Sequence, residues 1–203
     1  MKVIGITGGI CSGKSTISAI LQKNHGATIL DADKFGHQAY QQQTDCYRQL
    51  VAHFGKQIVA EDTGDINRKV LGSIVFADPA QMRALEQIVW PEILKLLNVE
   101  LSRIEPTCSL AVVEAAIMIE ANWHTQLPLD VLWVVQVPPA VAKERLMVRN
   151  SLSSEDADKR IASQMTNEER AKHAQYVLDN VGDQEQLAWE TKRLLEASMS
   201  TSK

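Results

Sequence analysis

Short apolar runs alternate with helix-like segments along this chain. The runs at 2–7, 27–33, 109–120 and 130–137 are rich in aliphatic and β-branched residues, and a weaker run spans 175–180. Continuous apolar runs of this length are typical of strands that are covered on both faces of a sheet. Because helical patterns separate the runs, we predict an α/β fold with a mostly parallel five-stranded sheet flanked by helices.

Helical periodicity dominates the remaining segments. Residues 14–24 carry apolar side chains at helical spacing, and Gly26 is a suitable residue to end that helix. The segment 34–105 contains no convincing strand pattern, but its apolar residues recur every three or four positions. We therefore expect a helical insertion there, with a kink or a break between two helices at Pro91.

A further helical stretch covers residues 140–173. Within it, Ser154 precedes the acidic pair Glu155 and Asp156, which is a helix-start signal. We expect a single domain whose parts are bounded as follows: core 1–33, 106–145 and 173–203, insertion 34–105, and intervening segment 146–172.

The overall composition is that of an ordinary globular protein. The chain has 203 residues, of which 45% are hydrophobic and 23% charged, and its net charge is −4. No apolar run is long enough to span a membrane, and no basic tract suggests nucleic-acid binding. The three cysteines are widely separated, as expected of reduced thiols. We expect a cytoplasmic protein that is a monomer or a weak homo-oligomer and binds neither nucleic acid nor membrane.

The pattern Gly8-x-x-x-x-Gly13-Lys14-Ser15 lies between the first predicted strand and the first predicted helix. In this pattern, backbone N–H groups surround the phosphates, the lysine reaches the β and γ phosphates, and the serine hydroxyl joins the Mg²⁺ shell. The helix that follows adds its positive end. The loop therefore predicts a P-loop fold that binds a nucleoside triphosphate, with Lys14 and Ser15 as the main contacts.

Asp31 and Asp33 end the second predicted strand, where period-two alternation would aim both side chains the same way. A carboxylate there could orient an acceptor hydroxyl and take its proton during phosphoryl transfer. The alternative is that one or both cap a helix that begins near Lys34.

Arginines supply the positive charge that phosphoryl transfer requires. Arg145 and Arg149 are four residues apart on one predicted helix face, so they can act on the same anion. Arg68, in the insertion, is a candidate for holding an anionic acceptor. For each arginine, the alternative is a solvated helix surface.

Taken together, these segments resemble the dephospho-CoA kinase family over roughly residues 3–180. The segments that carry the resemblance are "GITGGICSGKST", "LDAD", "INRKVLGSIVF", "RLMVRN", "RIASQM" and "YVLDN". The stretches "INRKVLGSIVF", "WPEI" and "VVEAAIMIEANW" are similar to the kinase domain of the animal bifunctional coenzyme A synthase.

The resemblance implies ATP-dependent phosphorylation of the ribose 3'-hydroxyl of dephospho-CoA, with Mg²⁺ present. It implies Asp33 as the base, with Lys14 and Arg145 also catalytic, and Asp31, Arg68 and Glu114 as further acceptor-binding residues. The residues implied to hold ATP are Gly8, Cys11, Ser12, Gly13, Lys14, Ser15, Thr16 and Arg149. The insertion 34–105 would bind the acceptor, and residues 146–172 would form a lid.

The sequence departs from the family pattern at Cys11, where a glycine is usual, so a positive φ at this position would be strained. Cys11 is either an inert small residue or a redox-sensitive one. Glu114 stands where an aspartate is frequent. Two other functions stay open: a P-loop kinase for another small metabolite, such as a nucleoside monophosphate or a sugar, and a non-catalytic nucleotide-binding module. A switch GTPase is disfavoured because no Asn-Lys-x-Asp motif occurs.

Overall fold

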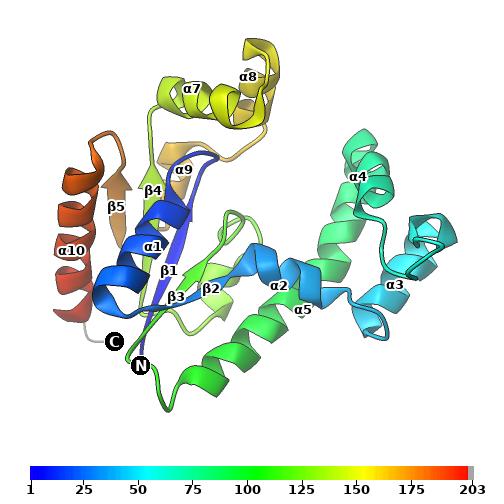
Figure 1. The fold of residues 1–203 in the computed structure, drawn as a ribbon, viewed down its shortest axis with the longest axis horizontal. Coiled ribbons are helices and arrows are strands. Elements are labelled where there is room, and N and C mark those ends of the chain that lie inside the picture. Colours follow the sequence, from blue (N-terminus) through cyan, green and yellow to red (C-terminus); the bar gives the residue numbers. More distant parts are fainter. Residues whose placement is uncertain (201–203) are drawn as a thin grey trace. The chain divides into compact units, whose positions relative to one another are not determined.

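The computed structural model describes residues 1–200, which divide into two compact units (Figure 1). The first unit contains Met1–Leu30 and the chain from Ile104 onward, and the second unit is Asp31–Arg103.

A five-stranded sheet forms the centre of the first unit, in the order β2-β3-β1-β4-β5. The β1–β3, β1–β4 and β4–β5 pairs are parallel. This arrangement confirms the predicted α/β fold. The strands are β1 (Lys2–Gly8), β2 (Thr28–Asp31), β3 (Leu110–Glu114), β4 (Val131–Gln136) and β5 (Tyr176–Asp179).

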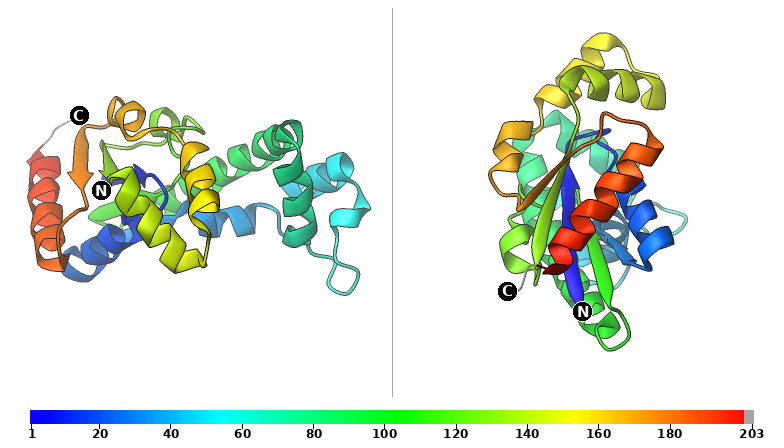
Figure 2. Two further views of the ribbon diagram at one scale, coloured as in Figure 1. Left: turned by 90° about the horizontal axis from the view of Figure 1, so that it is seen from above. Right: turned by 90° about the vertical axis from the view of Figure 1, so that its left-hand side faces the viewer.

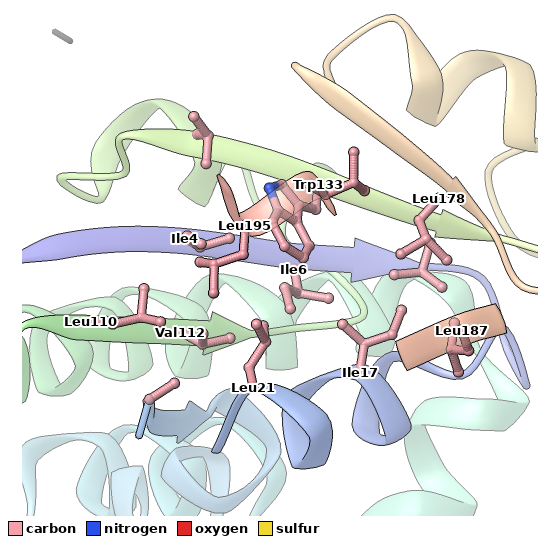
Figure 3. Close-up of a cluster of buried hydrophobic side chains, with 14 residues drawn as sticks. Ile4, Ile6, Ile17, Leu21, Leu110, Val112, Trp133, Leu178, Leu187 and Leu195 are labelled. Carbon is pink, nitrogen blue, oxygen red and sulfur yellow. The ribbon is translucent and has the colours of Figure 1, made fainter. Parts of the chain in front are cut away.

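One face of the sheet packs against α1 (Lys14–His25) and α10 (Gln184–Ser200), which lie side by side (Figures 1 and 2). Alternate residues of the central strands, such as Ile4, Ile6 and Trp133, are fully buried in this layer (Figure 3). The Trp133 indole donates a hydrogen bond of 2.9 Å to the Ser198 hydroxyl, so the buried polar atom has a partner on α10. The predicted first helix and its glycine end at Gly26, in the left-handed conformation, are confirmed.

The opposite face of the sheet is covered by the segment that follows β3. A Cβ atom at Gly5 would lie 2.6 Å from Leu129 and 2.9 Å from Met118, which shows how closely this segment approaches β1. The remaining helices of the unit are α6 (Trp123–Gln126), α7 (Pro139–Asn150), α8 (Ser154–Ala162) and α9 (Asn167–Ala171). Helices α7 and α8 pack against each other.

The second unit is helical, as predicted, with one isolated bridge between Val59 and Ile66. Its elements are α2 (Ala32–Ala39), α3 (Asp45–Phe54), the 3₁₀ turn η1 (Lys56–Ile58), α4 (Arg68–Ala77) and α5 (Pro79–Ile104). A kink or a break was expected at Pro91, and of these two the break is wrong, because α5 continues through this residue. Proline costs a helix one hydrogen bond, and here the helix is not interrupted by that loss.

The second strand is shorter than predicted. It ends at Asp31, whose carboxylate accepts a hydrogen bond of 3.0 Å from the Asp33 N–H and thereby caps α2. Asp33 consequently lies in the first turn of a helix, so the expectation that strand alternation aims Asp31 and Asp33 the same way is wrong. The alternative, that an aspartate caps the next helix, holds for Asp31, although the helix begins at Ala32.

Two other boundaries also differ from the prediction. The strand expected over 109–120 ends at Glu114, because the apolar residues beyond it are buried in turns that cover the sheet. A buried apolar run does not by itself distinguish a strand from another buried segment. The cap of α8 is Ser153, which accepts from the Asp156 N–H at 3.1 Å, so Ser154 is the first helical residue.

Candidate active site

The phosphate loop, residues 8–13, connects the end of β1 to the start of α1. Gly13 has φ 97°, and a Cβ at this position would lie 2.0 Å from the Asn180 amide nitrogen. Both the left-handed backbone and the close approach of Asn180 therefore require glycine. The second glycine of the motif is thus explained by its conformation and by a residue 167 positions away.

Cys11 also adopts the left-handed region, with φ 56°. Left-handed backbone costs a non-glycine residue roughly 1–2 kcal/mol, because its Cβ crowds the backbone. The sequence prediction that a positive φ here would be strained therefore applies to the conformation that the loop adopts.

Lys14 lies across the loop. Its ammonium group donates hydrogen bonds to the carbonyl oxygens of Gly8 at 2.9 Å and Gly9 at 3.1 Å. These bonds hold the positive charge against the loop, next to the start of α1, where the helix dipole also favours an anion.

Ser15, the residue after Lys14, and Glu114 bring together two side-chain oxygens that can act as metal ligands. The Ser15 hydroxyl donates to the Glu114 carboxylate at 2.7 Å. The sheet register brings them together, because Glu114 pairs with Ile6 on the strand that leads into the loop. Among the described residues, no group of three or more His, Cys, Asp or Glu side chains is arranged to hold a metal. Two hard oxygen donors fit Mg²⁺, which keeps several waters and takes the rest of its ligands from phosphates.

Arg145 and Asn180 hold the second half of the loop from outside. Arg145 donates to the Cys11 carbonyl at 3.3 Å and to the Asn180 carbonyl at 3.1 Å. The Asn180 amide donates to the Ser12 carbonyl at 2.8 Å, in a buried position. Peptide units are planar and trans, so a carbonyl held by Asn180 points the Gly13 N–H in the opposite direction.

A cavity of about 420 Å³ lies along this side of the loop. Arg145 and Arg149 both line it, so the structure brings together these two predicted residues and the loop. The lining residues are Cys11, Ser12, Gly13, Lys14, Ser15, Thr16, Arg145, Arg149, Asn180, Gly182, Asp183, Gln184 and Leu187. Its basic lining suits a polyphosphate.

Asp31, Asp33 and Arg68 belong to the second unit. There, the Arg68 guanidinium donates to the His37 ring nitrogen Nε2. Burial raises the pKa of Tyr40 above its ordinary value, and the Arg68 guanidinium opposes this rise by its charge and its hydrogen bond. Arg68 therefore lies in a polar cluster with His37 and Tyr40, the C-cap residue of α2.

Sequence reasoning missed Asn180 and Gln164, although both lie in segments that carry the family resemblance. The signal for Asn180 was its position directly after β5, because carboxyl ends of parallel strands meet at the same edge of the sheet. For Gln164, whose side chain accepts from the Ile10 N–H at 2.8 Å, no periodicity or spacing indicated a contact with the loop.

A phosphate loop between the first strand and first helix of a mostly parallel five-stranded sheet, with a helical unit inserted after the second strand, defines a P-loop kinase. The family model "Dephospho-CoA kinase" matches residues 2–186. The dephospho-CoA kinase of Geobacter sulfurreducens is 42% identical over 188 residues, which are 92% of this chain and 93% of the relative.

Two solved structures are similar to this chain in fold. A protein from Thermus thermophilus has a TM-score of 0.79 at 35% identity, with 97% of each chain covered. The dephospho-CoA kinase from Campylobacter jejuni has a TM-score of 0.72 at 26% identity, with all of both chains covered. The chain belongs to the dephospho-CoA kinase family. It is a kinase of the last step of coenzyme A biosynthesis, as the resemblance implied, and it uses ATP.

Proposed function

We propose that the loop and the cavity beside it bind the ATP phosphates and that residues of the second unit present the ribose 3'-hydroxyl of dephospho-CoA. The observation that carries this proposal is the position of Lys14, Ser15 and Glu114 around one end of the loop. Lys14 meets the β and γ phosphates, and Gly8, Cys11, Ser12, Gly13 and Thr16 complete the cradle.

Ser15, with Glu114 beside it, would hold Mg²⁺, and the ion would supply positive charge that offsets the negative charge of the phosphates. This assignment moves Glu114 from the acceptor to the metal side of the site. Arg145 and Arg149 line the same cavity and stabilise the charge on the transferred phosphoryl group.

Asp33 is the base that accepts the proton of the ribose hydroxyl. It is exposed in the first turn of α2, and its own backbone N–H donates the capping hydrogen bond to the Asp31 carboxylate. Arg68, with His37 and Tyr40, offers a cation and hydrogen-bonding groups for the anionic acceptor, and Asp31 fixes the start of α2 next to the base.

The proposed acceptor unit is the helical insertion, residues 34–105, and the proposed lid is residues 146–172, with 1–33, 106–145 and 173–203 as the core. Among residues 1–200, no helix combines the length and apolarity that crossing a bilayer requires. The three cysteines are free thiols. We propose a cytoplasmic enzyme that acts as a monomer or a weak homo-oligomer and binds no nucleic acid, in line with the net charge of −4.

The test is to incubate the chain with ATP, Mg²⁺ and dephospho-CoA and to identify the product by mass and by the position of the new phosphate. We expect coenzyme A from the wild type and none from Lys14→Ala. Asp33→Asn should keep its affinity for ATP but lose at least about 100-fold in kcat, the lower range for general-base catalysis.

Asp45→Asn is the matched control, because Asp45 is an exposed aspartate in the first turn of α3 in the same unit. It should keep the wild-type rate. A near-normal rate for Asp33→Asn would remove Asp33 from the role of base, and phosphorylation at another hydroxyl would refute the proposed presentation of the acceptor.

A further inference from the structure

The side chain of Gln164 joins the phosphate loop to the proposed lid segment, residues 146–172. Gln164 follows α8, and its Oε1 accepts a hydrogen bond of 2.8 Å from the Ile10 N–H, across 154 positions of sequence. A cavity of about 260 Å³ lies between the loop and this segment, and Gly9, Ile10 and Gln164 all line it.

A buried arginine fixes the segment that carries Gln164. Arg170 is 2% exposed and donates to the Met165 carbonyl at 2.5 Å and to the Glu120 carboxylate at 3.2 Å. A Cβ at Gly9 would lie 3.4 Å from Arg170 and 3.5 Å from the Gln164 oxygen. The loop and the segment therefore meet at Gly9 and Ile10, at ordinary van der Waals distance from the Gln164 and Arg170 side chains.

Some of the hydrogen bonds that anchor the loop come from a side chain within the motif, and others come from side chains outside it. Lys14 holds the Gly8 and Gly9 carbonyls from within the motif, and Arg145 and Asn180 hold the Cys11 and Ser12 carbonyls from outside it. Gln164 supplies the side-chain bond to the Ile10 N–H. The peptide that joins Gly9 and Ile10 thus has Lys14 on its oxygen and Gln164 on its nitrogen, which fixes its orientation.

We propose that Gln164 is a positioning residue through which the lid segment holds the first half of the phosphate loop in its ATP-binding conformation. The inference rests on the proposed function of the loop. Because a preorganised site does not have to be ordered when the ligand arrives, losing the tie weakens ATP binding. Gln164 acts through the backbone of Ile10 and requires no contact of its own with ATP.

The test compares Gln164→Met with Gln175→Met. Gln175 is a matched control, because its Oε1 accepts from the Leu132 N–H at 2.7 Å at the start of β4, away from the loop. Methionine keeps the length of the side chain and removes the acceptor oxygen. ATP affinity is measured by titration calorimetry without acceptor, and KM and kcat are measured in the full reaction.

We expect Gln164→Met to raise both the Kd and the KM for ATP about three- to tenfold, the equivalent of one hydrogen bond, and to change kcat less than about twofold. The Ile10 amide should exchange faster with solvent in Gln164→Met. Gln164→Glu keeps an acceptor oxygen at the same reach and should restore the protection of that amide. Gln175→Met should leave the Kd for ATP and the Ile10 exchange unchanged.

The Lys14→Ala variant distinguishes a failure of the positioning role of Gln164 from a failure of the proposed function of the loop. If Lys14→Ala loses ATP while Gln164→Met binds ATP as Gln175→Met does, the positioning role is refuted and the function of the loop stands. If Lys14→Ala binds ATP as the wild type does, the proposed function of the loop fails, and the inference fails with it.

Discussion

Replacing Asn180 by alanine tests whether the loop is held from outside its own motif. The Asn180 side chain is buried, with 7% exposed, and its bond to the Ser12 carbonyl is 2.8 Å long. A net hydrogen bond contributes about 1 kcal/mol, and leaving a buried carbonyl without a partner costs roughly 1–3 kcal/mol. We expect the free energy of unfolding to fall by about 2 kcal/mol.

This loss should be visible in both melting temperature and ligand affinity. For a chain of this size, 1 kcal/mol corresponds to a Tm change of about 2–4 °C, so Asn180→Ala should melt about 4–8 °C lower. The Gly13 N–H loses its fixed direction in the same step, because it shares a peptide with the Ser12 carbonyl. We expect the Kd for ATP to rise about tenfold, as for a loss of about 1.4 kcal/mol.

Asn98→Ala is the control for both measurements. Its amide donates to the Leu94 carbonyl at 3.0 Å, which is one turn earlier in α5, so the change also removes one amide-to-carbonyl bond. It should leave the affinity for ATP unchanged. An Asn180→Ala variant with wild-type Tm and ATP affinity would show that Asn180 does not shape the loop.

Three further predictions concern the cysteines. Cys11→Gly should raise the free energy of unfolding by about 0.5 kcal/mol in a urea titration, because relief of left-handed strain exceeds the entropy cost of glycine, whereas Cys11→Ala should give no gain. Burial raises the pKa of Cys46 to about 11. Iodoacetamide at pH 8 should therefore modify Cys11 and Cys108 and spare Cys46, as read by peptide mass spectrometry. Since the folded state favours the neutral Cys46 thiol, its contribution to stability is present below about pH 9 and is lost as the pH rises toward 11. Equal labelling of Cys46 and Cys108, or a larger gain in Cys11→Ala than in Cys11→Gly, would contradict these predictions.

The sequence was sufficient for features that are local. The apolar runs indicated the sheet because each buried strand is a continuous apolar segment, and the motif from Gly8 to Ser15 indicated the loop because its glycines and lysine lie within eight positions. The end of the second strand was wrong because an aspartate can either extend a strand or cap a helix, and the hydrogen bond from Asp33 to Asp31 decides between them.

The sequence was insufficient for the contacts that shape the loop. Asn180 lies 168 positions from Ser12, and Gln164 lies 154 positions from Ile10. An amide side chain that binds a backbone group leaves no periodic pattern in the sequence. Its partner cannot be recognised there either, because every residue offers the same kind of backbone group. Only the sheet topology, which places β4 beside β1 and β5 beside β4, brings these segments to the loop.

The motif and the anchoring side chains therefore have different physical roles in shaping the loop. The glycines of the motif permit the backbone to take left-handed conformations, but permission does not select one conformation of a flexible loop. Selection comes from Arg145, Gln164 and Asn180, which lie beyond residue 140 and bind peptide groups of residues 10–12 directly. Since two of these three are neutral amides that add no charge to the site, a substitution that removes either should weaken ATP binding without changing the charge that meets the phosphates. Affinity for ATP in this kinase should then depend on the integrity of α7, the segment after α8 and the end of β5 as well as on Lys14.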